Sequence, residues 1–271
     1  SSGLQTIAHA ANQIIADQAD VLVAGGIELM SAVPMGGNEP TNNPILQDED
    51  SGVSYPMGLT AEMVAETYNV SREDQDAYAV QSHQRAAEAQ QSGKFEDEII
   101  PIEVNKVTYD QNGPVISKEV FKDDELIRPD TNKEALAKLK VKELGVKPIA
   151  RFVGFKAVGV DPKLMGIGPA YAIPEVLKQA DLDVSDIDLV ELNEAFASQT
   201  LASMREVGLD TEKTNVNGGA IALGHPLGAT GAMLVGRLLS EMKKRPDTKY
   251  GMVTMCIGVG MGAAGIFEYI R

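Results

Sequence analysis

The feature that most constrains the fold is a series of short apolar runs, each followed by glycine or by a polar cluster, with helical patterns between them. Residues 187–192 and 252–256 have the character of such strands. Residues 169–180, 196–206 and 229–243 carry apolar side chains at helical spacing. Helix and strand patterns that alternate in this way predict an α/β fold built in layers.

The same alternation is present elsewhere in the chain. Residues 5–16 predict a helix, and the apolar, glycine-ended run at residues 21–26 predicts a buried strand. A further strand is predicted at residues 149–158. The runs at 252–256 and 264–269 are separated by a glycine turn, which predicts a hairpin.

Residues 29–130 interrupt this alternation. Residues 34–58 hold four prolines among Gly and Asn, so they predict an irregular loop. A helix is predicted at residues 60–69. Ser71 then resembles an N-cap, with Asp74 at the third capping-box position, and opens a helix to about residue 91. So long an excursion between α/β segments predicts an inserted loop subdomain.

Composition excludes several classes of partner. The formal net charge of −15 repels nucleic acid and anionic membranes at long range, so we expect neither as a partner. No apolar run is long enough to span a bilayer, and the first residues lack a signal-like core, so we expect a cytoplasmic protein. A single cysteine, Cys256, excludes an internal disulfide framework. We predict no metal site.

Three polar or glycine-rich clusters follow predicted strands or open helices, at residues 193–197, 217–229 and 256–262. Ligands of open α/β sheets bind at the carboxyl ends of strands, so this placement favours a site there. Each residue also has a structural interpretation. Asn193 could cap a helix, His225 could be a structural histidine, and Cys256 could be a packed core thiol. Taken singly, none of them identifies an active site.

Four strings taken together resemble the thiolase family. They are DPKLMGIGP at 161–169, NEAFA at 193–197, NGGAIALGHPLG at 217–228 and CIGVGMG at 256–262. The resemblance extends over essentially the whole chain and implies a layered αβαβα fold. It divides the chain into the end of an N-terminal thiolase half (1–28), the loop subdomain (29–130) and a C-terminal half (131–271).

The resemblance implies chemistry on acyl groups carried by coenzyme A. Thiolases condense acyl-CoA molecules in a Claisen reaction or cleave 3-ketoacyl-CoA with free coenzyme A, through a cysteine acyl-enzyme. His225, with a water held by Asn193, matches one oxyanion hole. Cys256 matches the acid/base at the acetyl carbon, and the Gly258 N–H matches a second oxyanion hole.

Four further positions match substrate contacts of the family. Met57, Met165 and Phe196 match residues around the pantetheine and acyl pocket, and Arg128 matches an arginine near the adenine end. The resemblance implies CoA thioesters as substrates, no permanently bound cofactor, and assembly as a homodimer or homotetramer.

The sequence departs from the family pattern at two places. The family nucleophile stands immediately before the position of Ser1, so we expect the N-terminal half to be largely missing from this sequence. Between Lys140 and Val141 we expect a further missing segment, which in thiolases supplies a core strand and contacts to coenzyme A.

The sequence leaves several alternatives for the activity open. The strings at 55–62 and 127–129 resemble the degradative, broad-chain branch of the family more than the acetoacetyl-CoA-specific acetyl-CoA C-acetyltransferases, which stay as the alternative. A β-ketoacyl synthase shares the general fold but resembles a Cys-His-His arrangement. A non-catalytic acyl-CoA binding protein and an inactive fragment are further alternatives.

Overall fold

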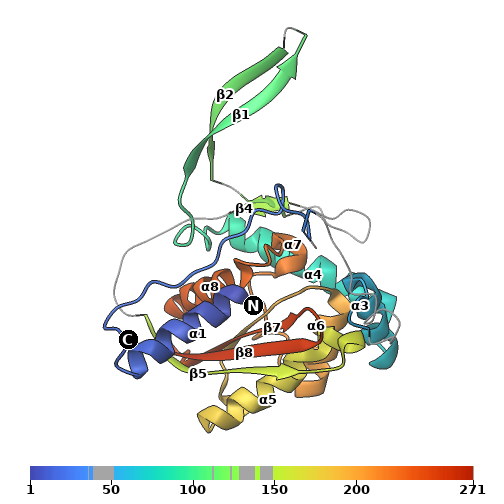
Figure 1. Ribbon diagram of the computed structural model, residues 1–271, viewed down its shortest axis with the longest axis vertical. Coiled ribbons are helices and arrows are strands. Elements are labelled where there is room, and N and C mark those ends of the chain that lie inside the picture. Colours follow the sequence, from blue (N-terminus) through green and yellow to red (C-terminus); the bar gives the residue numbers. More distant parts are fainter. Residues whose placement is uncertain are drawn as a thin grey trace.

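The computed structural model describes residues 1–35, 37–38, 52–111, 113–122, 124–127, 138–140 and 149–270. A four-stranded mixed sheet forms its centre (Figure 1). In spatial order its strands are β5 (Ala150–Gly159), β8 (Met261–Tyr269), β7 (Tyr250–Ile257) and β6 (Leu189–Leu192). β8 pairs antiparallel with both β5 and β7, whereas β6 pairs parallel with β7. These elements confirm the predicted hairpin and the two other strands predicted in the second half of the chain.

Helices cover both faces of the sheet. One face packs against α5 (Gly168–Ala180) and α6 (Ala197–Val207), and the other against α1 (Ser2–Ile15) and α8 (Thr230–Lys244). The alternation of side chains along a strand divides the two cores. In β7, for example, Met252 packs with the α5 side and Val253 with the α8 side. The predicted layers are therefore present in this part of the chain.

The helices agree with the predicted ranges within about one turn at each end. In α4 (Arg72–Gln91), Ser71 Oγ accepts a hydrogen bond from Asp74 N at 3.1 Å, which confirms the predicted N-cap. The helix ends at Ser92, and Gly93 follows at φ +70°, a left-handed conformation that glycine adopts without strain. α3 (Met57–Thr67) starts three residues before the predicted position.

The strand predicted at residues 21–26 is wrong for this structure. These residues form no strand, and Val21 and Val23 are 82% and 99% exposed. A β-strand requires a neighbouring strand to bond its backbone groups, and no described strand pairs with this segment. Instead, Thr6 Oγ1 donates to Gly25 O, and Gly228 N donates to the Glu28 carboxylate at 2.9 Å. The segment is therefore tied to α1 and to the loop that precedes α8.

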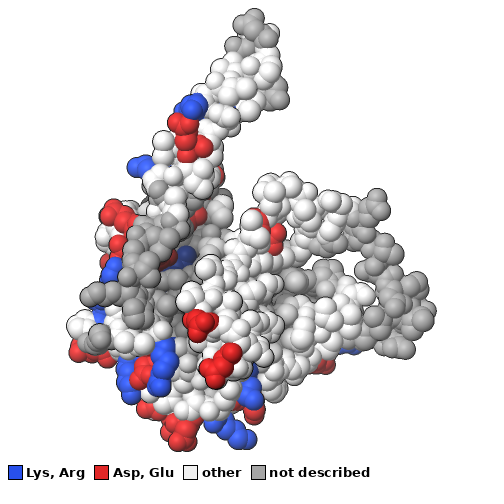
Figure 2. All heavy atoms as spheres, turned by 60° about the vertical axis from the view of Figure 1, so that its left-hand side comes forward, with Lys and Arg blue, Asp and Glu red and all other residues white. Residues whose placement is uncertain are grey.

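A long hairpin within residues 29–130 was not predicted. It consists of β1 (Ile102–Asp110) and β2 (Gly113–Phe121) and projects away from the body of the protein (Figure 1). Cross-strand ion pairs join Lys106 to Glu119 and Lys118 to Glu103, each at 2.5 Å. Figure 2 shows basic and acidic side chains side by side along this arm. Its pattern escaped detection because both faces are exposed and neither is consistently apolar.

The remaining described elements are short. They are β3 (Asp124–Leu126), β4 (Lys138–Lys140), η1 (Pro162–Ile167), η2 (Val184–Asp186) and α7 (Ala220–Leu223). Over the described ranges, no helix is both long and apolar enough to cross a membrane. The division at residues 28 and 130 stays a prediction, and Val141 of the Lys140–Val141 junction lies outside the described residues.

Two buried ionisable side chains lie between β6 and α8. Glu191 and Arg237 are only 2% and 3% exposed. Glu191 Oε2 and Arg237 Nε find no hydrogen-bond partner among the residues that the structure describes. Burial raises the pKa of Glu191 to about 8; Arg237 acts in the opposite direction, while Glu98 and the neighbouring carboxylates raise the pKa further. The Glu191 carboxyl is therefore mainly protonated at neutral pH.

We expect Glu191→Gln to raise the melting temperature at pH 8 and to change it little at pH 5. The unfolded carboxyl titrates near 4.5 and the folded one near 8, so the folded state alone keeps the proton between these values. The free energy of unfolding then falls by about 1.4 kcal/mol per pH unit as pH rises through this window. Glutamine has no such dependence. Thermal unfolding followed by circular dichroism at both pH values measures the difference, and an equal effect at pH 5 and pH 8 would contradict the assignment.

Candidate active site

The parallel pairing of β6 and β7 brings two predicted site residues to one edge of the sheet. Asn193 follows β6, and its backbone N donates to Thr254 O of β7 at 2.9 Å. Cys256 lies near the end of β7 and is 7% exposed, and Gly258 opens the turn that follows. The carboxyl ends of neighbouring parallel strands meet at the same edge, which is where ligands of α/β folds bind.

The loop after α7 places His225 beside Asn193. His225 Nε2 lies 3.3 Å from Asn193 Nδ2, and the Asn193 side chain is fully buried. Asn193 Oδ1 accepts no hydrogen bond from the described residues. A buried amide oxygen without a protein donor is an acceptor that suits a water or a ligand donor. The structure thus brings together two residues that the sequence places 32 positions apart.

A hydroxyl group fixes the proton on the His225 ring. Thr230 Oγ1 donates its only proton to Pro226 O at 2.8 Å. The contact of 2.8 Å between Thr230 Oγ1 and His225 Nδ1 must therefore carry the ring proton on Nδ1. Burial lowers the pKa of His225. The neutral ring then presents the lone pair of Nε2 toward Asn193, and Nε2 becomes a donor only after it accepts a proton.

The amino end of α1 lies beside His225 and Cys256. Ser1 lies close to both side chains, and Figure 1 shows the N-terminus beside α8 and above β7. Burial raises the pKa of the Cys256 thiol to about 11, although its own backbone N–H acts in the opposite direction. The positive end of the helix dipole also favours negative charge here. The described arrangement therefore combines a neutral imidazole, a protonated thiol and a helix N-terminus.

The structure gives positions for three of the four residues predicted to contact the substrate. Met57, the first residue of α3, lies against Gly258, since a side chain built at Gly258 would come within 3.5 Å of Met57 Cε. Met165 is buried in η1, and Phe196 is half-buried where α6 begins. Their roles stay predictions. Arg128 lies outside the described residues.

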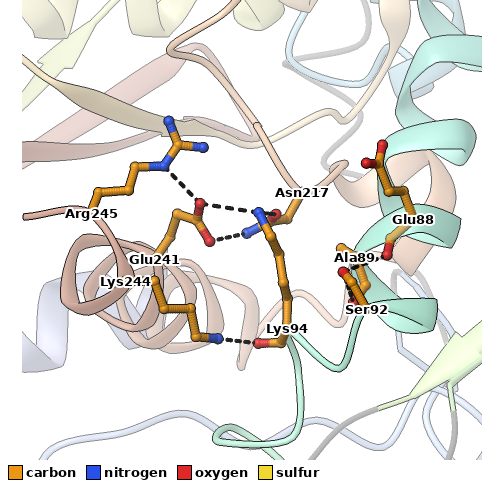
Figure 3. A network of polar contacts seen from close by, with 8 residues as sticks. All are labelled: Glu88, Ala89, Ser92, Lys94, Asn217, Glu241, Lys244 and Arg245. Atoms are coloured by element: carbon orange, nitrogen blue, oxygen red, sulfur yellow. Dashed lines mark hydrogen bonds and ion pairs between the residues drawn. The ribbon is translucent and has the colours of Figure 1, made fainter.

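Sequence reasoning missed the residues that hold the glycine-rich segment before His225. Glu241 of α8, which is 3% exposed, accepts from Asn217 Nδ2 at 2.9 Å, from Arg245 Nε at 2.7 Å and from Lys94 Nζ at 3.2 Å (Figure 3). Lys94 Nζ also donates to Asn217 Oδ1 at 3.0 Å. Asn217 is thereby fixed through both side-chain atoms. The sequence signal for this network was Glu241, a charged residue at a position where the helical pattern of residues 229–243 places apolar side chains.

Two glycines of this segment are required by close approach. Gly218 adopts φ +78°, and a side chain there would come within 2.5 Å of Ser82 O of α4. A side chain at Gly219 would come within 2.1 Å of the Glu194 carboxyl carbon. The segment thus runs directly against α4 and the residue after Asn193.

We expect Thr230→Val to release the proton from Nδ1 of His225. Valine has a similar shape but cannot accept a hydrogen bond, so the ring loses the shorter of the two contacts that favour a proton on Nδ1, and only the contact of 3.3 Å between Nε2 and Asn193 Nδ2 remains. The chain has only three histidines, so ring ¹⁵N spectra of histidine-labelled protein resolve His225 directly. The two ring signals should move toward the Nε2–H pattern. Unchanged ¹⁵N shifts would show that Thr230 does not set the tautomer, and Thr6→Val on α1 is a matched control.

Comparison with known proteins places this geometry in a family. The model of the "Thiolase, N-terminal domain" matches residues 1–143, and that of the "Thiolase, C-terminal domain" matches residues 146–269. The 3-ketoacyl-CoA thiolase of Bacillus subtilis is 47% identical over 300 aligned positions that cover 99% of this chain and 76% of the relative. The peroxisomal 3-ketoacyl-CoA thiolase 1 of Arabidopsis thaliana is 44% identical over 99% of this chain and 68% of its own length. Since the first alignment is longer than this chain, the Bacillus protein carries residues within the aligned span that this sequence lacks.

Solved structures agree with the sequence comparisons. The dimeric peroxisomal thiolase of Saccharomyces cerevisiae aligns with a TM-score of 0.83 and 38% identity, over all of this chain and 74% of the other. The human mitochondrial 3-ketoacyl-CoA thiolase aligns with a TM-score of 0.82 and 36% identity, over all of this chain and 77% of the other. A further structure of the yeast peroxisomal enzyme is described as five layers built from two core domains of identical topology. With both family domains matched over nearly its full length and an aligned fold, this chain belongs to the thiolase family.

Proposed function

We propose that this protein is an acyltransferase that cleaves 3-ketoacyl-CoA with coenzyme A to acetyl-CoA and a shortened acyl-CoA, or runs the reverse Claisen condensation. The observation that carries the proposal is the contact of 3.3 Å between Asn193 and His225 at the sheet edge where Cys256 and the N-terminus of α1 also lie. The relatives named as 3-ketoacyl-CoA thiolases support the reaction class.

His225 has two roles in this proposal. Its neutral ring, protonated on Nδ1, first accepts a proton on Nε2 from the attacking thiol. That thiol belongs to a cysteine that the family resemblance places immediately before Ser1, at the amino end of α1, where the helix dipole stabilises a thiolate. Once protonated, Nε2 donates to the oxyanion formed from the carbonyl under attack. A water that donates to Asn193 Oδ1 would supply the second donor.

Cys256 serves as the acid in the cleavage direction. When the nucleophile attacks the keto carbon, the bond between this carbon and the carbon next to the thioester breaks, and its electron pair remains on the acetyl-CoA fragment. The Cys256 thiol transfers its proton to that carbon, which leaves a thiolate on Cys256 and releases acetyl-CoA. The raised pKa keeps the thiol protonated for this step. Coenzyme A then takes the acyl group from the enzyme and restores both thiols.

The substrate class is proposed to be 3-ketoacyl-CoA of broad chain length, in line with the names of the curated relatives. The acetoacetyl-CoA-specific reaction stays as the alternative, because an acetyl-CoA acetyltransferase of Bacillus anthracis aligns with a TM-score of 0.82 and 36% identity. Assays with acetoacetyl-CoA and 3-ketohexadecanoyl-CoA distinguish the two. Activity on the four-carbon substrate alone selects the alternative.

Binding and assembly follow from the same relatives. The human mitochondrial enzyme has been solved in complex with CoA, and we propose CoA thioesters as the substrates here, with no permanently bound cofactor. The yeast structure is dimeric, and we propose a homodimer, with a homotetramer as the larger alternative. A cytoplasmic location is proposed from the sequence, although relatives from plants and rat are named peroxisomal.

We expect Cys256→Ser, in the protein expressed from its complete gene, to impair cleavage and formation of the carbon–carbon bond by about 10²-fold or more. Serine is a far weaker acid and base than cysteine at neutral pH. Proton transfer at carbon depends on this residue more strongly than proton transfer at the sulfur of coenzyme A during the first acetyl transfer. Exchange of label between acetyl-CoA and coenzyme A measures that first step and should change less than tenfold. Equal losses in the two assays would contradict the role of Cys256.

A further inference from the structure

The carboxylate of Glu194 lies at the junction of three segments behind the candidate site. It follows Asn193 directly and is 2% exposed. Its two oxygens accept hydrogen bonds from four donors, and all four donors are uncharged groups. Oε1 accepts from Tyr78 Oη at 3.0 Å and Asn215 Nδ2 at 2.9 Å, and Oε2 accepts from Ser82 Oγ at 2.7 Å and Ile221 N at 3.1 Å.

The four donors belong to separate parts of the chain. Tyr78 and Ser82 lie on α4, whereas Asn215 and Ile221 lie on the two sides of the glycines that precede His225. Ser82 Oγ also accepts from Gly219 N at 3.1 Å. Asn215 exchanges two further hydrogen bonds of 2.8 Å with the backbone of Leu192, the last residue of β6. Glu194 thereby connects α4, the end of β6 and the glycine-rich segment.

These contacts constrain both members of the pair at the site. Asn193 is the neighbour of Glu194 in sequence, and Ile221 precedes His225 by four residues. Any movement of the Glu194 carboxylate therefore displaces the backbone on both sides of the contact between Asn193 and His225. Displacements of about 1 Å are enough to reduce rates by about 10²-fold in sites that depend on orientation.

We propose that Glu194 is a positioning residue, which holds Asn193 and His225 at the distance that the oxyanion hole requires. This inference rests on the proposed function. Burial raises the pKa of Glu194, and its four hydrogen bonds act in the opposite direction, because they match the ionised form, whose two oxygens act solely as acceptors. A glutamine at this position has nearly the same shape but turns one of its two ends into a donor that faces two other donors.

The test compares three variants of the protein expressed from its complete gene. Glu194→Gln should lower kcat for thiolysis by about 10- to 100-fold and change KM for the acyl-CoA less than threefold. Tyr78→Phe removes one donor without placing a new one against the carboxylate, so its loss in kcat should be smaller and in the same direction. Arg205→Gln is the matched control, because it breaks an exposed ion pair with Asp74 that also joins α6 to α4.

A second readout separates this inference from the proposed function. In ¹⁵N-histidine spectra, Glu194→Gln and Tyr78→Phe should both shift the ring signals of His225, whereas Arg205→Gln should leave them in place. If the protein without substitutions shows no thiolase activity, the proposed function is refuted, but the positioning role of Glu194 is not. Unmoved His225 signals in Tyr78→Phe, or a kcat of Glu194→Gln within twofold of the unmodified protein, would overturn the positioning role. If Glu194→Gln does not fold, Tyr78→Phe alone decides.

Discussion

The parallel pairing of β6 with β7 is the constraint on which the site depends. It places the residue after β6 and the end of β7 at one edge, and the bond from Asn193 N to Thr254 O continues this pairing beyond the strand. Both strands are buried on both faces, between α5 and α8, and most of their residues are apolar, with Glu191 in β6 and Thr254 in β7 as polar exceptions. The helices therefore fix the register of the sheet, and the register fixes the distance between Asn193 and the turn after Cys256.

Polar contacts then bring the third component to this edge. The glycine-rich segment before His225 has few side chains of its own to pack, and buried carboxylates on two sides hold it instead. Glu241 fixes Asn217, and Glu194 fixes Asn215 and Ile221. A neighbouring carboxyl, Glu191, stays protonated because its burial is not offset in the same way. Burial raises the pKa of Glu194 as well, although its four hydrogen bonds act in the opposite direction, whereas the donors around Glu241 lower its pKa.

The sequence predicted the elements whose pattern is local. Each of the helices α1, α4, α5, α6 and α8 has a periodic face or a cap, and Ser71 is an example of a cap that could be identified from the residue type three positions later. The run at residues 21–26 has the composition of a buried strand but lacks a described neighbour, and composition cannot supply one. Pairing between segments is the part of the fold that such patterns do not encode.

The same limit applies to the site. Asn193, His225 and Cys256 were identified because they stand in strings that resemble a family, and the structure brings the first two into contact. Glu194 stands in one of those strings, but its partner Tyr78 lies 116 residues away, so its function could not be inferred before the fold was known. Thr230 was likewise passed over, because nothing in its neighbours indicates that its hydroxyl is committed to Pro226 O.

The most direct test of this account is a crystal structure of the protein expressed from its complete gene with an acyl-CoA thioester bound. The account requires the thioester oxygen to lie within hydrogen-bond distance of His225 Nε2 and of a water on Asn193 Oδ1, with Cys256 Sγ facing the adjacent carbon. A thioester bound at another edge of the sheet, with these three side chains out of contact with it, would contradict the assignment of the site.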